Sequence, residues 1–399
     1  MSGRARQFLG LGLLLAVVLA VVGFQLRRDD AEPVAAPSGP EPITVAGRIG
    51  SEKEGFLQSQ AVREILATKY GLTVNATNAG SLDMVREPRP DEDFLWPSSE
   101  VALALFREEF GSAAPAETIF NSPIVLYAWS DVTKALIAAG LVAQEGETYY
   151  VNDFPRLVRM IDEGRTWADV GLPTLYGGVA IFTTDPTRSN SGNMFSGLLA
   201  NTLNNGQVVD ETTVGPHLPT IRRFYDRLGL LQNRSGDLFN QFLSQGIGAM
   251  PMIAGYESQL TEFSLASPDY REVLRERINV LYPRPTVFSS HPVIALTPNG
   301  ERLLAALRDP ELQRIAWEAH GFRSGLTGVE NDPAVLDVVG IPETVQSVIP
   351  MPRPAAMARI IEALGAPAGA PAATPPSAAM GVGLLAAVQP RRARRSVAP

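Results

Sequence analysis

The sequence predicts an α/β protein with mixed, mostly parallel sheets. Short runs rich in Val and Ile alternate with helical patterns from Ile43 to about Leu364, and such alternation is typical of strand–helix units. Several of these runs end in polar, glycine-bearing turns that lead into helices, as strands do in open α/β sheets. With 399 residues, of which 45% are hydrophobic, the chain is long enough for two cored lobes or one large domain.

Each apolar run or periodic segment is assigned to one element. The predicted strands are 43–46, 72–75, 124–128, 178–183, 249–253, 278–282 and 293–296. The predicted helices are 54–70, 100–110, 132–139, 153–163, 194–203, 220–228, 237–245, 300–307 and 310–320.

Charge and cysteine content exclude several classes of protein. The formal net charge of -8 argues against a nucleic-acid-binding surface, which would need a basic patch or stripe. The chain contains no cysteine, so it has no disulfide, thiolate metal site, cysteine nucleophile or acylated cysteine anchor.

Residues 1–28 contain an apolar run from Phe8 to Phe24 with arginines on both sides. A membrane-spanning helix needs about 17–25 apolar residues, whereas the apolar part of a signal peptide has about 7–15. The residues after the run, Gln25–Asp30, form a poor cleavage context. We therefore favour an uncleaved, single-pass membrane anchor with the main domain outside the cytoplasm, and keep a cleaved signal, which would make the protein secreted, as the alternative.

The regions next to the main domain have compositions typical of a linker and a disordered tail. Residues 29–42 contain four prolines in DDAEPVAAPSGPEP, which indicates an extended spacer. Residues 365–399 are rich in Ala, Pro and Gly and end in a cluster of arginines, so we expect a disordered tail.

Three polar turns follow predicted strands or precede helices in the first part of the chain. In the turn from Gly50 to Glu54, Ser51 and Glu54 fit a helix capping box, and Lys53 with the helix amides could instead receive an anion. Ser81 lies in the second turn, and Ser98 or Ser99 in the third fits a helix N-cap. Binding and capping both account for these serines.

Two further turns lie in the middle of the chain. The segment from Thr183 to Asn193 gathers more donors at one helix start than a cap requires, which favours recognition of a carboxylate or oxyanion. The candidate ligand-binding residues there are Thr187, Arg188, Ser189, Asn190 and Ser191. After the run 249–253, Tyr256 offers a flat ring and a hydroxyl, and Glu257 could pair with a cationic group or lie in solvent.

Four passages taken in order give the chain a family resemblance. They are RTWADVG (165–171), YGGVAIFTTDPTRSNSGNMFSGLLAN (176–201), GIGAMPMIAGYESQL (246–260) and HPVIALTPNGERLLAALRDPELQRIAWEAHGFRS (291–324). In this order they resemble the type II periplasmic solute-binding proteins, the receptor components of ABC importers. The resemblance spans nearly all of 43–345.

The resemblance implies two lobes joined by a hinge. Lobe I would comprise 43–125 and 284–364, and lobe II would comprise 126–283. Such lobes close around a ligand. The chain departs from the family in lacking the acylated cysteine and in its tail.

We therefore expect an extracytoplasmic protein that captures a small polar solute, with an oxyanion or carboxylate favoured, and no cofactor. An ABC permease or another membrane protein would be the partner, and the alternative function is a membrane-anchored sensing or adaptor module. An enzyme is disfavoured, since the chain has no GxSxG elbow or phosphate loop and its three histidines are not spaced for a metal. A hydrolase would need residues scattered along the sequence.

Overall fold

The computed structural model describes residues 41–336 and 338–365. The predicted membrane or signal segment 1–28, residues 29–40 of the predicted linker, and the tail beyond Gly365 lie outside these residues. Among the helices of the described part, none combines the length and the apolar character needed to cross a membrane.

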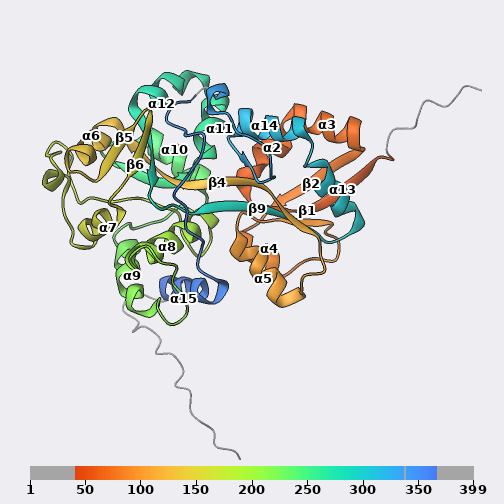
Figure 1. The fold of residues 1–399 in the computed structure, drawn as a ribbon, viewed down its shortest axis with the longest axis horizontal. Coiled ribbons are helices and arrows are strands. Elements are labelled where there is room, and N and C mark those ends of the chain that lie inside the picture. Colours follow the sequence, from red (N-terminus) through yellow and green to blue (C-terminus); the bar gives the residue numbers. More distant parts are fainter. Residues whose placement is uncertain (1–40, 337, 366–399) are drawn as a thin grey trace, which may run out of the picture.

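A ten-stranded mixed sheet runs through both halves of the molecule (Figure 1). Its main path is β2-β1-β3-β9-β4-β8-β6-β5, and β7 and β10 also pair with β4. The strands are β1 (Ile43–Ile49), β2 (Leu72–Asn78), β3 (Phe94–Trp96), β4 (Ala116–Trp129), β5 (Val142–Glu145), β6 (Thr148–Val151), β7 (Met252–Tyr256), β8 (Ile278–Pro283), β9 (Phe288–Ala295) and β10 (Arg323–Ser324).

The long strand β4 joins two lobes. Its first part pairs with β9 and β10, and its second part pairs with β7 and β8. Lobe I contains β1, β2 and β3 on one side of this crossing, and lobe II contains β5 to β8 on the other (Figure 1). The two-lobed α/β class is therefore confirmed, whereas the chain boundaries of the lobes stay a prediction.

The expectation of mostly parallel strands is wrong. Parallel pairing is limited to β1–β2, β1–β3 and β6–β8, and the other pairs of described strands are antiparallel. Most of the difference comes from β4, because β7, β8, β9 and β10 all pair with it in antiparallel orientation.

The helices cover the sheet in both lobes (Figure 1). They are α2 (Glu54–Gln58), α3 (Gln60–Tyr70), α4 (Ser81–Arg86), α5 (Glu100–Phe110), α6 (Ser130–Ala138), α7 (Phe154–Asp162), α8 (Asn190–Leu203), α9 (Leu218–Asp226), α10 (Ser235–Gln245), α11 (Ser258–Ala266), α12 (Arg271–Arg277), α13 (Pro298–Ala306), α14 (Pro310–His320) and α15 (Pro354–Gly365). Short 3-10 turns are η1 (Ser51–Lys53), η2 (Trp167–Val170), η3 (Gly215–His217), η4 (Pro268–Tyr270) and η5 (Pro333–Val335).

Each lobe has its own apolar core. The lobe II core surrounds α8, whose buried residues include Phe195, Leu198 and Leu199, and the lobe I core centres on aromatic residues such as Phe56 and Phe120. All nine predicted helices have counterparts in the structure, although 54–70 is divided at Ser59. The periodic apolar residues of these segments face the cores, which is why the pattern located them.

The predicted strand 178–183 is the main element that the structure does not contain. Its residues form isolated bridges, from Gly178 to Thr166 and from Phe182 to Ile253, and Thr184 then pairs with Gln232. The chain touches a different segment at each point, so no continuous ladder forms, although the segment contains the strand-favouring residues Val179, Ile181 and Phe182.

Helix α15 was not predicted from the sequence and connects the lobes. It packs against α8 and α9 of lobe II and also contacts α5 of lobe I. Its Met357 and Ile360 are buried in the same apolar cluster as Val101 of α5.

Candidate functional site

The ends of three adjacent strands in lobe I form one side of the candidate site. Strands β2, β1 and β3 are parallel neighbours, so their carboxyl ends lie at the same edge of the sheet. The turns after them are Gly50–Lys53, Asn78–Ser81 and Pro97–Ser99. Ser81 Oγ accepts a hydrogen bond of 2.9 Å from the amide of Ser98, which connects the second and third turns.

Lobe II forms the other side with segments that are distant in sequence. The loop before α8 brings Arg188 and Ser189, the loop before α10 brings Asn233 and Arg234, and the end of β7 brings Tyr256. The first amides of α8 have no carbonyl four residues earlier within the helix, so this helix end favours negative charge.

A pocket of about 230 Å³ lies between these two sides. Its lining residues are Gly50, Ser51, Glu52, Asn78, Ala79, Gly80, Ser81, Arg188, Ser189, Asn190, Asn233, Arg234, Ser235 and Tyr256. A smaller pocket of about 20 Å³ adjoins it and shares Arg188, Ser189 and Asn190. Hydroxyl, amide and charged groups dominate the lining, which suits a small polar ligand.

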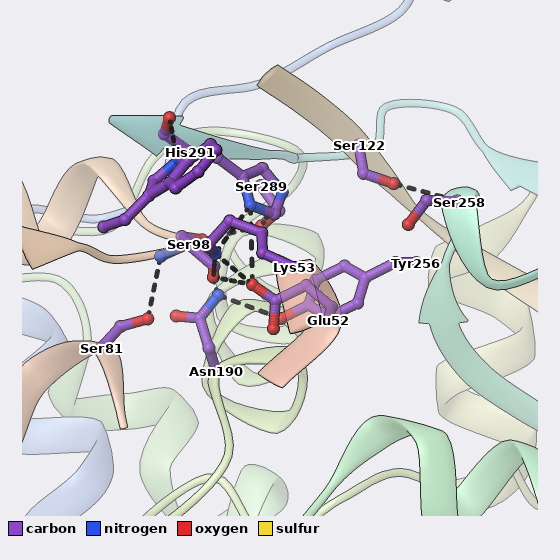
Figure 2. A network of polar contacts seen from close by, with 11 residues as sticks. Glu52, Lys53, Ser81, Ser98, Ser122, Asn190, Tyr256, Ser258, Ser289 and His291 are labelled. Atoms are coloured by element: carbon purple, nitrogen blue, oxygen red, sulfur yellow. Dashed lines mark hydrogen bonds and ion pairs between the residues drawn. The ribbon is translucent and has the colours of Figure 1, made fainter. Parts of the chain in front are cut away.

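A buried polar network forms the floor of this pocket on the lobe I side (Figure 2). The ammonium group of Lys53 donates to Glu52 Oε1, to Ser98 Oγ at 2.6 Å and to His291 Nδ1 at 3.2 Å. Ser98 Oγ in turn donates to Glu52 Oε1. The side chains of Lys53 and His291 are 0% exposed, and that of Glu52 is 9% exposed.

The hydrogen bonds of this network fix the protonation of its members. Because Lys53 donates to Nδ1 of His291, the imidazole is neutral and carries its proton on Nε2, which lies 3.4 Å from Ser289 Oγ. Ser289 Oγ donates to the carbonyl of Ser98 at 2.7 Å. The three protons of Lys53 are all used within the network.

The pKa shifts agree with this assignment. Burial raises the pKa of Glu52, but the charge of Lys53 and the hydrogen bonds from Lys53 and Ser98 outweigh it and lower this pKa to about 2. Burial lowers the pKa of His291 well below 6.5, and the charge of Lys53 lowers it further. Burial also lowers the pKa of Lys53, against the attraction of Glu52. The floor therefore contains an ionised carboxylate and a neutral imidazole.

Contacts across the pocket hold the lobes together. Asn190 Nδ2 of α8 donates to the carbonyl of Ser98 in lobe I at 2.6 Å and to Tyr256 OH at 3.1 Å. At the rim, Arg234 lies 3.7 Å from Glu54. The two lobes are thus in contact at both the floor and the rim of the pocket.

The structure brings six of the twelve predicted ligand-binding residues to the pocket lining. These are Ser51, Ser81, Arg188, Ser189, Asn190 and Tyr256. Ser98 lies beneath them in the network, and Thr187 lines the small adjoining pocket. Ser191 is buried and forms a hydrogen bond of 2.8 Å with Thr184. Whether the lining residues bind a ligand stays a prediction.

Three predicted residues have other surroundings. Lys53 has no exposed side-chain surface. Its ammonium group therefore compensates the charge of Glu52 and does not contact a ligand directly. Ser99 caps α5 by accepting from the amide of Val101, as the capping interpretation predicted. Glu257 is buried away from the pocket lining and pairs with Arg323 at 2.7 Å, because it lies where β7 meets α11 beside β10.

The predicted capping box of Ser51 and Glu54 is wrong. The 3-10 turn begins after Gly50, and no side chain caps it. A Cβ at Gly50 would lie 2.4 Å from Ser98 Oγ and 2.3 Å from Glu52 Oε1. The absence of a side chain there is what lets the carboxylate approach the end of β3.

Several site residues carry no clear signal in the sequence. Glu52 was passed over because it stands next to a lysine in a turn, His291 because it is isolated in sequence, and Ser289 because it lies within a strand. The loop of Asn233 and Arg234 offered a sequence signal, since it is polar and precedes a helix start at Ser235.

Acid is expected to destabilise the protein through His291 and Glu52. Below about pH 6.5 the unfolded chain protonates this histidine while the folded protein keeps it neutral, and Glu52 acts in the same direction between pH 4.5 and about 2. The free energy of unfolding should therefore fall as the pH falls, by up to about 1.4 kcal/mol per pH unit for each such proton. Urea unfolding of the wild type and of His291→Asn between pH 7 and 5 should show the shallower slope in the variant; equal slopes would contradict the assignment.

No family model and no curated protein matches the sequence, whereas many solved structures share the fold. An extracellular solute-binding protein from Bordetella parapertussis has a TM-score of 0.51 at 10% identity, over 80% of this chain and 96% of that chain. The substrate-binding protein of an ABC transporter from Agrobacterium tumefaciens has a TM-score of 0.50 at 13% identity, over 83% and 96%. Iron-bound HitA from Pseudomonas aeruginosa has a TM-score of 0.50 at 13% identity, over 81% and 97%.

The likeness to these three structures extends over most of each chain. Each is covered almost from end to end by this chain, so the similarity includes both lobes and the strands that join them. The chain therefore has the two-lobed α/β fold of the type II periplasmic solute-binding proteins.

Proposed function

We propose that this protein is an extracytoplasmic solute-binding protein that captures a small anionic solute in the pocket between its lobes. The observation that carries the proposal is the pocket itself, which both lobes line and to which Arg188, Arg234 and the start of α8 contribute positive charge. Delivery of the solute to an ABC permease is part of the proposal, and the Agrobacterium neighbour, a substrate-binding protein of such a transporter, supports it.

The charges around the pocket favour an anion. Arg188 is exposed and forms no ion pair with any described residue, whereas Arg234 is shared with Glu54 at 3.7 Å. The carboxylate of Glu52 is compensated by Lys53. Arginine donors in a fork are well matched to carboxylates and oxyanions.

The arrangement does not call for catalysis or a metal. The pocket floor is a hydrogen-bond network in which Lys53 and His291 point to protein partners (Figure 2). Although HitA binds iron, no cluster of three or more His, Cys, Asp or Glu side chains that could hold a metal ion is found within 41–336 and 338–365. Binding without turnover is the function that this chemistry supports best.

A thermal-shift screen of the purified full-length chain tests the proposal. A panel of carboxylates, oxyanions, amino acids and sugars is added, and a ligand at 100 times its Kd is expected to add about 2.7 kcal/mol to the free energy of unfolding. At least one anion should raise the melting temperature. Stabilisation by neutral sugars alone, or by nothing in the panel, would overturn the proposal.

Replacing Arg188 by alanine is expected to weaken binding of the anion found in this screen by about tenfold or more, since hydrogen bonds to charged groups contribute about 1.5–3 kcal/mol. Titration calorimetry measures the change in Kd. Arg314→Ala is the matched control, because Arg314 lies on the surface of α14 and pairs with Glu318 within the same helix. Equal Kd values for the two variants would remove Arg188 from the site.

A further inference from the structure

The network beneath the pocket has one unused hydrogen-bonding position. Lys53 and Ser98 both direct their protons at Oε1 of Glu52, and the closest nitrogen of His291 is also 3.5 Å from Oε1. The second oxygen, Oε2, has no hydrogen-bond partner among the described residues. Since Glu52 lines the pocket, this oxygen is available to what the pocket contains.

This position can only accept a hydrogen bond. The pKa of Glu52 is about 2, held low against burial by Lys53 and by the hydrogen bond from Ser98, so the carboxyl group carries no proton of its own at neutral pH. The protons of Lys53 are already committed to Glu52, Ser98 and His291. The network therefore cannot turn a donor toward the pocket at this point without breaking a buried hydrogen bond.

The lobe II side of the pocket has the opposite character. Arg188 and Arg234 are donors without acceptor capacity, and the start of α8 adds the positive end of the helix dipole. A ligand that spans the pocket thus meets donors on the lobe II side and an anionic acceptor on the lobe I side.

We infer that the solute is an acid that carries, besides its anionic group, a hydroxyl or ammonium donor directed at Oε2 of Glu52. This inference rests on the proposed function and specifies its ligand class. An acid without a donor would displace the water from Oε2 and leave this oxygen unpaired, or it would place a second acceptor against it. Either outcome weakens binding. A purely cationic solute would instead face the two arginines.

Pairs of acids that differ by one hydrogen-bond donor test the inference on the wild-type, full-length protein. Propionate is compared with lactate, and succinate with malate, which are charge-matched at pH 7, and alanine replaces the hydroxyl of lactate by an ammonium group; thermal shift and titration calorimetry measure binding. The donor-bearing member of at least one pair should bind tenfold or more tightly than its partner. If both members of every binding pair have the same Kd, solute capture stands and the inference is overturned. If no member of any pair binds although another anion of the screen does, the inference is overturned and solute capture stands. If no anion of the screen binds, the proposed function itself is overturned.

The variant Glu52→Gln tests the role of the carboxylate directly. Its amide can present a donor where Oε2 presented an acceptor, so the preference for the donor-bearing acid should disappear or reverse. Glu64→Gln is the control, because Glu64 lies on the exposed face of α3 and contacts Gln60. An unchanged preference in a folded Glu52→Gln protein would overturn the inference, and the wild-type panel decides the matter if this variant does not fold.

Discussion

Replacing Arg323 by methionine is expected to destabilise the protein by about 3–5 kcal/mol, because the change leaves the carboxylate of Glu257 buried without its counter-ion. Nε and one terminal nitrogen of Arg323 bind the two carboxylate oxygens at 2.7 and 3.0 Å. The side chains of Arg323 and Glu257 are 7% and 1% exposed. Tyr282 also donates to Glu257, at 2.5 Å.

The ion pair between Arg323 and Glu257 also connects the two lobes. Glu257 follows β7 of lobe II, whereas Arg323 lies in β10, which pairs with the lobe I part of β4. Arg323 further donates to the carbonyls of Pro342 and Glu343. The pair thus joins lobe II, lobe I and the segment that leads to α15 at the crossing between the lobes.

Urea unfolding measures the effect of Arg323→Met. The exposed pair Arg314–Glu318 supplies the control, and Arg314→Met should change the free energy of unfolding by about 1 kcal/mol or less. Adding Glu257→Gln to Arg323→Met should recover part of the loss, because the unpaired charge is removed. A loss below about 1 kcal/mol for Arg323→Met would show that the pair is not the buried contact described here.

Replacing Lys53 by methionine is the second change with a large expected effect, again about 3–5 kcal/mol of lost stability. It removes the cation that compensates Glu52 and leaves Ser98 and His291 without their donor. The pKa of Glu52 should rise from about 2, since the charge and the hydrogen bond of Lys53 both lower it. The loss of unfolding free energy at low pH should consequently begin at a higher pH than in the wild type.

Denaturant unfolding as a function of pH separates this effect from a simple loss of packing. Lys134→Met is the matched control, because Lys134 is 76% exposed and its pair with Asp131 spans 3.4 Å at the surface. Combining Lys53→Met with Glu52→Gln should restore much of the stability. Equal stabilities of the Lys53 and Lys134 variants would contradict the buried network.

The order of elements was readable from the sequence, because amphipathic helices and apolar strands carry their period locally. The turns after β1, β2 and β3 were also found, since their polar residues interrupt apolar runs. Strands β3, β5, β6 and β10 were missed because they have only two to four residues, too few to show a period. Helix α15 was missed although five of its first six residues are apolar or proline.

Within the site, residue type alone could not decide which side chain meets the pocket. The sequence favoured Lys53 as an anion-binding group, but its side chain is fully buried in the floor, and its neighbour Glu52 lines the pocket instead. Adjacent residues in a turn point in different directions, and their directions depend on the backbone dihedral angles and on what packs against them. Gly50 is an example, since its missing side chain makes room for the carboxylate.

The sequence by itself determined the α/β class, the nine helices predicted from it and the polar turns, all of which depend on residues close together in the chain. Only the tertiary structure decided that Lys53, Ser98 and His291 share one network, and that Glu257 pairs with Arg323 rather than with a ligand. Lys53 and His291 are separated by 238 positions and Glu257 and Arg323 by 66. Burial, counter-ions and the direction of each side chain arise when such distant segments pack together, and they decide which polar groups are left for a solute.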